Sequence, residues 1–173
     1  VGVAMALAAW GLLDVYLVPL QWWRDSGVPG WFEEQLGLVY RGLSGLPENW
    51  VLNTGDEENP IRRLTSTFLS PLATAYVLVI VLLFLVARRR GGWTVAAAGV
   101  ACVGLLWPHT RAAYRALAVG LVVLGIAQRR ALPVVLAVAS LVVGIGFVKA
   151  FPHIGPSTSY TRAELVILRA QGQ

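Results

Sequence analysis

Apolar residues fill five stretches of the chain with few interruptions. They cover residues 1–20, 68–87, 93–107, 112–127 and 131–151. A helix of about 20 apolar residues crosses the roughly 30 Å hydrocarbon core of a bilayer. The third and fourth stretches are shorter, which a helix packed inside a bundle tolerates. The pattern therefore predicts an all-α fold, a polytopic transmembrane helix bundle of about five spans.

Small residues within these spans allow neighbouring helices to approach closely. The glycines concerned are Gly99, Gly104, Gly120, Gly125, Gly144 and Gly146. The longest connection, residues 21–67, is longer than a plain connector. We expect a surface helix within it, over residues 31–43. Its aromatic residues suit the headgroup layer of a membrane; they are Trp22, Trp23, Trp31, Phe32, Tyr40 and Trp50.

Two arginine clusters, at residues 88–90 and 129–130, directly follow apolar runs. Cytoplasmic loops carry such clusters, so both are expected inside the cell. Alternation then places residues 21–67, the turn at 108–110 and the tail from residue 152 outside.

Composition agrees with this assignment, because 57% of the 173 residues are hydrophobic and only 13% are charged. A soluble domain could not bury that much apolar surface. The net charge of +5 is read as an orientation signal, so no nucleic acid partner is expected. The first residue is not Met and a polar segment has just begun at the last residue. We therefore expect a fragment of one membrane domain, inactive alone, in which residues 152–173 open a large outer loop.

Arginines on the expected outer face are the strongest candidates for chemistry. Arg62 and Arg63 precede the second span, and Arg111 and Arg115 are four residues apart, on one helix face. A planar guanidinium grips phosphate through two bonds, so converging arginines predict a site for a phosphorylated or pyrophosphorylated lipid head. The alternatives are that Arg62 and Arg63 anchor the interface and that Arg111 and Arg115 only snorkel to headgroups.

Asp14 lies within the first span, where a carboxylate is either functional or the salt-bridge partner of a nearby arginine. His109 and His153 fall in outer turns and are either general bases or solvated turn residues. Lys149 is expected to snorkel. Two histidines without acidic companions make no metal site. No glycine-rich phosphate loop is present, and no cofactor is expected.

Three segments resemble motifs of the O-antigen ligase and O-antigen polymerase superfamily. They are residues 62–76 (RRLTSTFLSPLATAY), 109–118 (HTRAAYRALA) and 157–165 (STSYTRAEL). The first pairs an arginine with a run of small residues and a proline at the start of a span. The second places an arginine before an aromatic residue and Leu-Ala, and the third resembles the start of the family's large periplasmic loop. Thr65 to Thr67 stand where glycine and asparagine are common in the family, and Leu165 lacks the tryptophan often seen after it.

The resemblance implies a metal-independent membrane glycosyltransferase in the bacterial inner membrane, with its active face outside the cytoplasm. Such an enzyme moves a glycan from undecaprenyl pyrophosphate to an acceptor sugar or lipid. By motif position, the resemblance implies that Arg63, Arg111 and Arg162 bind the pyrophosphate. Arg62, Arg115 and Asp14 are candidates for a supporting role. The family's catalytic histidine would lie beyond Gln173, so the catalytic residue is unknown.

Two other classes of protein stay open. One is a non-enzymatic membrane protein that binds anions or lipid heads, such as part of a transporter. Transporters are marked by broken helices and inverted repeats, and the sequence has no repeat. The other is a scaffold whose arginines only anchor headgroups. The sequence does not distinguish a ligase from a polymerase.

Overall fold

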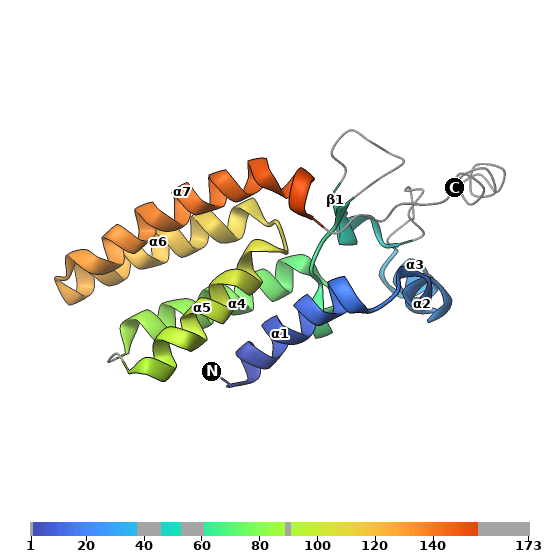
Figure 1. The fold of residues 1–173 in the computed structure, drawn as a ribbon, viewed down its shortest axis with the longest axis horizontal. Helices are drawn as coiled ribbons and strands as arrows, with labels where there is room; N and C mark the ends of the chain where they lie inside the picture. The colour runs from blue at the N-terminus through green and yellow to red at the C-terminus, as the bar shows by residue number, and fades with distance from the viewer. Residues whose placement is uncertain (1, 38–45, 53–60, 89–90, 156–173) are drawn as a thin grey trace.

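The computed structural model is an α-helical bundle, and it describes residues 2–37, 46–52, 61–88 and 91–155. Within these residues, five long helices run lengthwise beside one another (Figure 1). They are α1 (Gly2–Leu17), α4 (Pro71–Ala87), α5 (Gly92–Leu106), α6 (Arg111–Gln128) and α7 (Ala131–Ile154). Each corresponds to one of the five predicted apolar stretches, so the all-α class is confirmed.

The ends of these helices follow from local chemistry. Ser70 caps α4 by accepting a hydrogen bond from the backbone N–H of Ala73, and Pro71 occupies the first turn, where its missing N–H costs nothing. α1 stops at Leu17, ahead of Pro19. α7 continues three residues past its expected end at residue 151, with Pro152 inside its last turn.

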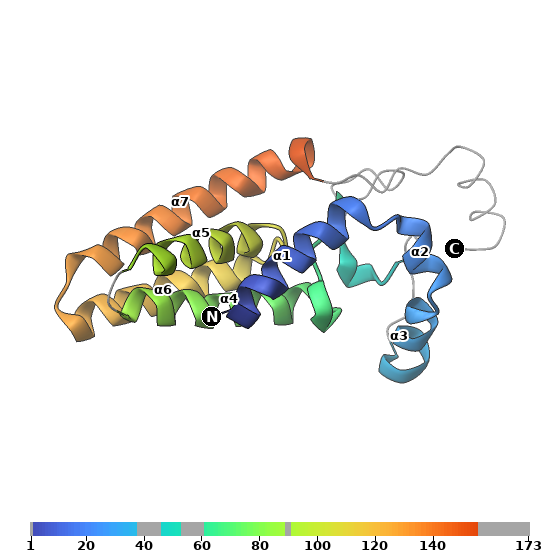
Figure 2. The same cartoon turned by 60° about the horizontal axis from the view of Figure 1, so that its bottom comes forward.

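Smaller elements gather at one end of the bundle (Figure 2). They are α2 (Leu20–Asp25), α3 (Val28–Leu36), the 3-10 turns η1 (Glu48–Trp50) and η2 (Ser66–Phe68), and the strands β1 (Val51–Leu52) and β2 (Ile61–Arg62). The strands pair antiparallel, with Val51 opposite Arg62, and mark what we call the β-hairpin end. Of the surface helix expected over residues 31–43, residues 38–43 lie outside the described residues, and α3 covers residues 31–36. It ends early because Gly37, at φ 63°, forms a left-handed cap.

The main core lies among α1, α4, α5 and α6. α4 contacts the other three, whereas α7 packs mainly on α6. Buried residues of this core include Ala8, Leu78, Ala101, Leu117 and Leu121. Their alanines bring the helix axes close together, as small residues do in membrane bundles.

A second core forms at the β-hairpin end from Trp23, Phe32, Leu46 and Trp50. Trp50 packs edge-to-face against Trp23, at 5.0 Å between ring centroids, and against Phe32, at 5.7 Å. Three of the six aromatic residues expected at the headgroup layer, Trp23, Phe32 and Trp50, are thus buried inside the protein. Trp22 and Trp31 are exposed, and Tyr40 lies outside the described residues. Their placement in a headgroup layer stays a prediction.

In the part of the chain that the structure describes, two helices, α6 and α7, are long and apolar enough to cross a membrane. Only 33% of the most apolar 18-residue segment of α6, and 22% of that of α7, is buried in the structure. The core helices of a soluble protein are mostly buried. On α7, Val135, Val138, Val142 and Ile145 are each at least 60% exposed. α1, α4 and α5 are apolar but shorter, so the number of spans stays a prediction.

Glycines mark the closest helix contacts. A Cβ on Gly104 would lie 2.6 Å from the Cβ of Ala8 in α1, whereas a Cβ on Gly99, in the same helix, would meet nothing within 4 Å. Only the first glycine is therefore needed for the contact between α1 and α5.

We expect Gly104→Ala to unfold with a free energy about 1–3 kcal/mol below that of Gly99→Ala, because the added methyl group overpacks the α1–α5 contact. Both variants gain the same helix propensity, so their difference isolates the steric effect. Reversible unfolding in mixed micelles with sodium dodecyl sulfate, followed by circular dichroism, measures it. Equal stabilities would mean that α1 and α5 are not in contact at Gly104.

Candidate functional site

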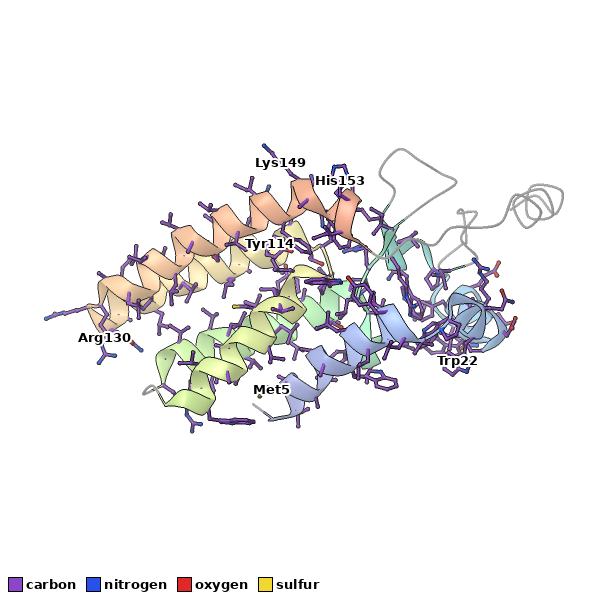
Figure 3. All side chains as sticks on the ribbon, viewed as in Figure 1. Met5, Trp22, Tyr114, Arg130, Lys149 and His153 are labelled. Carbon is purple, nitrogen blue, oxygen red and sulfur yellow. The ribbon has the colours of Figure 1, made fainter. Side chains whose placement is uncertain are left out.

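The helices alternate in direction, so the charged residues of their connections lie at the two opposite ends of the bundle. The turn between α5 and α6 and the end of α7 lie at the β-hairpin end, with Lys149 and His153 (Figure 3). Arg130, between α6 and α7, lies at the opposite end. Arg88 and Arg130, one residue from each predicted arginine cluster, line a common pocket there.

A buried ion pair joins α1 to β2. The Nη2 of Arg62 lies 2.9 Å from the Oδ2 of Asp14, and the two side chains are 4% and 1% exposed. The indole Nε1 of Trp23 donates to the other carboxylate oxygen at 2.7 Å. Nη1 of Arg62 also donates to the backbone oxygens of Asp14 and Val18. Of the two interpretations of Asp14, the structure supports the salt-bridge partner.

This pairing determines what Arg62 does. Burial lowers the pKa of the Arg62 guanidinium, while the charge and hydrogen bond of Asp14 act in the opposite direction. The guanidinium stays charged and faces Asp14 rather than the surface. Arg62 is therefore placed as a structural residue, which holds the β-hairpin end against α1.

Arg63 ties three segments together at the same end. Its Nε donates to the backbone oxygen of Pro108 at 2.8 Å, Nη1 to that of Asn49 at 3.1 Å, and Nη2 to the hydroxyl of Thr110 at 3.2 Å. Burial lowers its pKa. These bonds fix the α5–α6 turn and place a permanent positive charge beside it.

His109 lies in that turn and is buried, at 6% exposed. The sequence-based alternative of a solvated turn histidine is therefore wrong for His109, although His153 is exposed. The His109 ring stacks on Phe151 at 4.8 Å between centroids, and its φ of 51° is left-handed. Its Nδ1 has no hydrogen-bond partner among the described residues. Burial lowers its pKa to about 4, and the charges of Arg63 and Arg111 add to the shift. His109 is therefore neutral at physiological pH.

A groove between α6 and α7 is the most chemically suggestive feature. Its cavity volume is about 320 Å³, and it is lined by three cationic side chains, those of Arg111, Arg115 and Lys149. The rest of the lining is Tyr114, Leu141, Gly144, Ile145 and Val148. The groove therefore combines positive charge with an apolar floor.

Tyr114 and Gly144 give the groove its shape. The Tyr114 hydroxyl donates to the backbone oxygen of Leu106 at 2.9 Å, which fixes the ring. A Cβ on Gly144 would lie 3.3 Å from that ring, tighter than an ordinary contact. The glycine therefore lets α7 lie close against the tyrosine.

The structure brings together only part of the predicted site. Arg111 and Arg115 share the groove, Arg63 acts with Arg111 on His109, and Arg62 is paired with Asp14. Arg162 lies outside the described residues. Within the described ranges, no group of three or more His, Cys, Asp or Glu residues could hold a metal ion.

Sequence reasoning missed Lys149 and Tyr114 as members of the groove. Lys149 was expected only to snorkel, and Tyr114 was noted only as part of a motif. The spacing of Arg111, Tyr114 and Arg115 at i, i+3 and i+4 was the available signal, because it places all three on one helix face.

No protein-family model, curated protein or solved structure matches this chain. The resemblance to the O-antigen ligase and polymerase superfamily therefore stays a prediction.

Proposed function

We propose that this chain belongs to a multi-pass protein of the bacterial inner membrane that transfers a glycan, outside the cytoplasm, from undecaprenyl pyrophosphate to an acceptor sugar or lipid. The groove between α6 and α7 carries the proposal. Its three cations, Arg111, Arg115 and Lys149, suit a phosphorylated head, and its apolar floor suits a hydrocarbon chain. The exposed apolar faces of α6 and α7 support their placement in a bilayer.

Charge explains how such a groove would promote transfer. The acceptor oxygen bonds to the anomeric carbon of the donor sugar while the bond to the pyrophosphate oxygen breaks. The acceptor proton passes to a base, and undecaprenyl pyrophosphate leaves with the additional negative charge. Arg111 and Arg115 would stabilise this growing charge, which is greater in the transition state than in the bound donor.

Arg63 and His109 contribute by position. Arg63 holds the α5–α6 turn, directly before Arg111. His109 stays neutral beside Arg63 and Arg111, so the turn adds no further positive charge at physiological pH. Together they present Arg111 at the start of α6, where the backbone N–H groups also favour an anion.

A second candidate is a non-enzymatic protein that binds a lipid head, such as a transporter. The same observation favours it, because the groove accounts for binding without any transfer step. The two functions differ in where an unused lipid-linked glycan collects. Loss of an outer-face transferase leaves it on the outer leaflet, whereas loss of a transporter leaves it on the inner leaflet.

The test deletes the gene in its native bacterium and measures lipid-linked glycan by mass spectrometry, with and without an impermeant oxidant that destroys glycan on the outer face. Wild type, Arg111→Gln and Arg129→Gln are then expressed at matched levels. Arg129 ends the same helix but does not line the groove.

We expect outer-face glycan to accumulate on deletion and to clear with wild type and with Arg129→Gln. With Arg111→Gln it should persist, because removing one transition-state contact slows transfer by about 10²–10³-fold. Accumulation on the inner leaflet would favour the transporter instead. An unchanged pool on deletion, without a paralogue, would reject both.

A further inference from the structure

A second basic pocket lies at the end of the bundle opposite the β-hairpin, where the α4–α5 and α6–α7 connections meet. Its cavity volume is about 490 Å³, and Arg88, Gln128 and Arg130 line it together with the apolar side chains of Val86, Leu132 and Pro133. Figure 3 shows Arg130 far from Lys149 and His153. This pocket is therefore distinct from the groove between α6 and α7.

The pocket wall is held in place by contacts between its two sides. Gln128, at the end of α6, donates to the backbone oxygen of Ala87, at the end of α4, at 3.5 Å. The Arg88 guanidinium lies over the Phe84 ring, with its Cζ 4.7 Å from the centroid. This cation–π contact holds one face of the guanidinium against α4 and leaves its N–H edges for a ligand.

The two arginines have no anion to neutralise them among the described residues. Neither Arg88 nor Arg130 makes an ion pair or a side-chain hydrogen bond there. Both are exposed and line one cavity from different connections. Like charges placed together in this way are stabilised by an anion bound between them.

We propose that this pocket binds the headgroup phosphate of an anionic phospholipid. The two arginines favour a bound anion, and the apolar lining favours an anion that is attached to a hydrocarbon chain. The pocket also lies at the ends of α6 and α7, the two helices long enough to cross a bilayer, and hence at headgroup level. Basic pockets between helices on the cytoplasmic side are suited to such lipids. The proposal does not depend on glycan transfer.

Lipid competition tests the proposal. The intact protein is purified in detergent and offered equal amounts of phosphatidylglycerol and phosphatidylcholine, and native mass spectrometry counts the bound lipids. The variants are Arg88→Gln, Arg130→Gln and, as a matched control, Arg129→Gln. Arg129 neighbours Arg130 but does not line the pocket.

We expect wild type and Arg129→Gln to retain phosphatidylglycerol in preference to phosphatidylcholine. Arg88→Gln and Arg130→Gln should each lower that preference about fivefold. All three positions are exposed, so the variants should fold, which thermal unfolding checks. An equal loss in Arg129→Gln would indicate general surface charge and overturn the proposal. Equal retention of both lipids by wild type would overturn it as well.

Discussion

We expect Asp14→Ala to lower the free energy of unfolding by about 3–5 kcal/mol, because it leaves the Arg62 guanidinium buried without its counter-ion. Arg62 is only 3% exposed, so water cannot replace the carboxylate. The same change removes the acceptor of the Trp23 indole N–H, and Trp23 belongs to the second core. The variant should therefore destabilise the β-hairpin end as well as the position of α1.

Two further variants sharpen this measurement. Asp25→Ala removes an exposed carboxylate that accepts a hydrogen bond from Gln21, and its effect should stay within about 0.5 kcal/mol. The double change Asp14→Leu with Arg62→Met replaces both charges by apolar groups and should recover most of the lost stability. Unfolding in mixed micelles gives all three values. An Asp14→Ala loss as small as that of Asp25→Ala would contradict the buried ion pair.

Acidification should destabilise the fold through His109. Its pKa is about 4 in the folded chain, against an ordinary value of 6.5. The unfolded chain therefore binds a proton first as the pH falls, and stability is lost between about pH 6.5 and pH 4. The contribution is complete above pH 6.5 and amounts to about 3 kcal/mol.

The histidine variants separate this effect from other titrations. His109→Asn keeps a residue type that tolerates positive φ but removes the titrating ring. Its stability should fall less steeply than that of wild type over this pH window. His153→Asn alters an exposed histidine near the end of α7 and should leave the slope unchanged. Parallel slopes for wild type and His109→Asn would show that His109 is not buried as described.

The long helices were predictable because each needs only a continuous apolar run. Helix ends were less predictable, because hydropathy does not register backbone geometry. Gly37 ends the short helix α3 with a left-handed cap, and α7 continues through Pro152 to Ile154. The β-hairpin end was not predicted at all. Its core depends on Trp23 and Trp50 meeting across 27 residues of sequence, and no local pattern specifies that contact.

The candidate site was predicted in part for the same reason. Arg111 and Arg115 lie on one helix, so helical periodicity was enough to pair them. Lys149 joins them from α7, and the sequence alone does not say which faces of two helices meet. Arg62 is the last residue of β2 and bonds to Asp14, whereas Arg63, the next residue, bonds to the α5–α6 turn. Hydropathy does not indicate that two neighbouring arginines have different partners.

The ion pair between Asp14 and Arg62 also delays the final placement of α1 during synthesis. The two residues are 48 positions apart, and ribosomes add about 5–20 residues per second. Roughly 2–10 seconds therefore pass between the synthesis of Asp14 and that of Arg62. Throughout this interval the first helix carries a carboxylate without its arginine, so α1 cannot take its final position until the β-hairpin end has been made. Of the helices described, α1 is therefore made before the others but reaches its final position late.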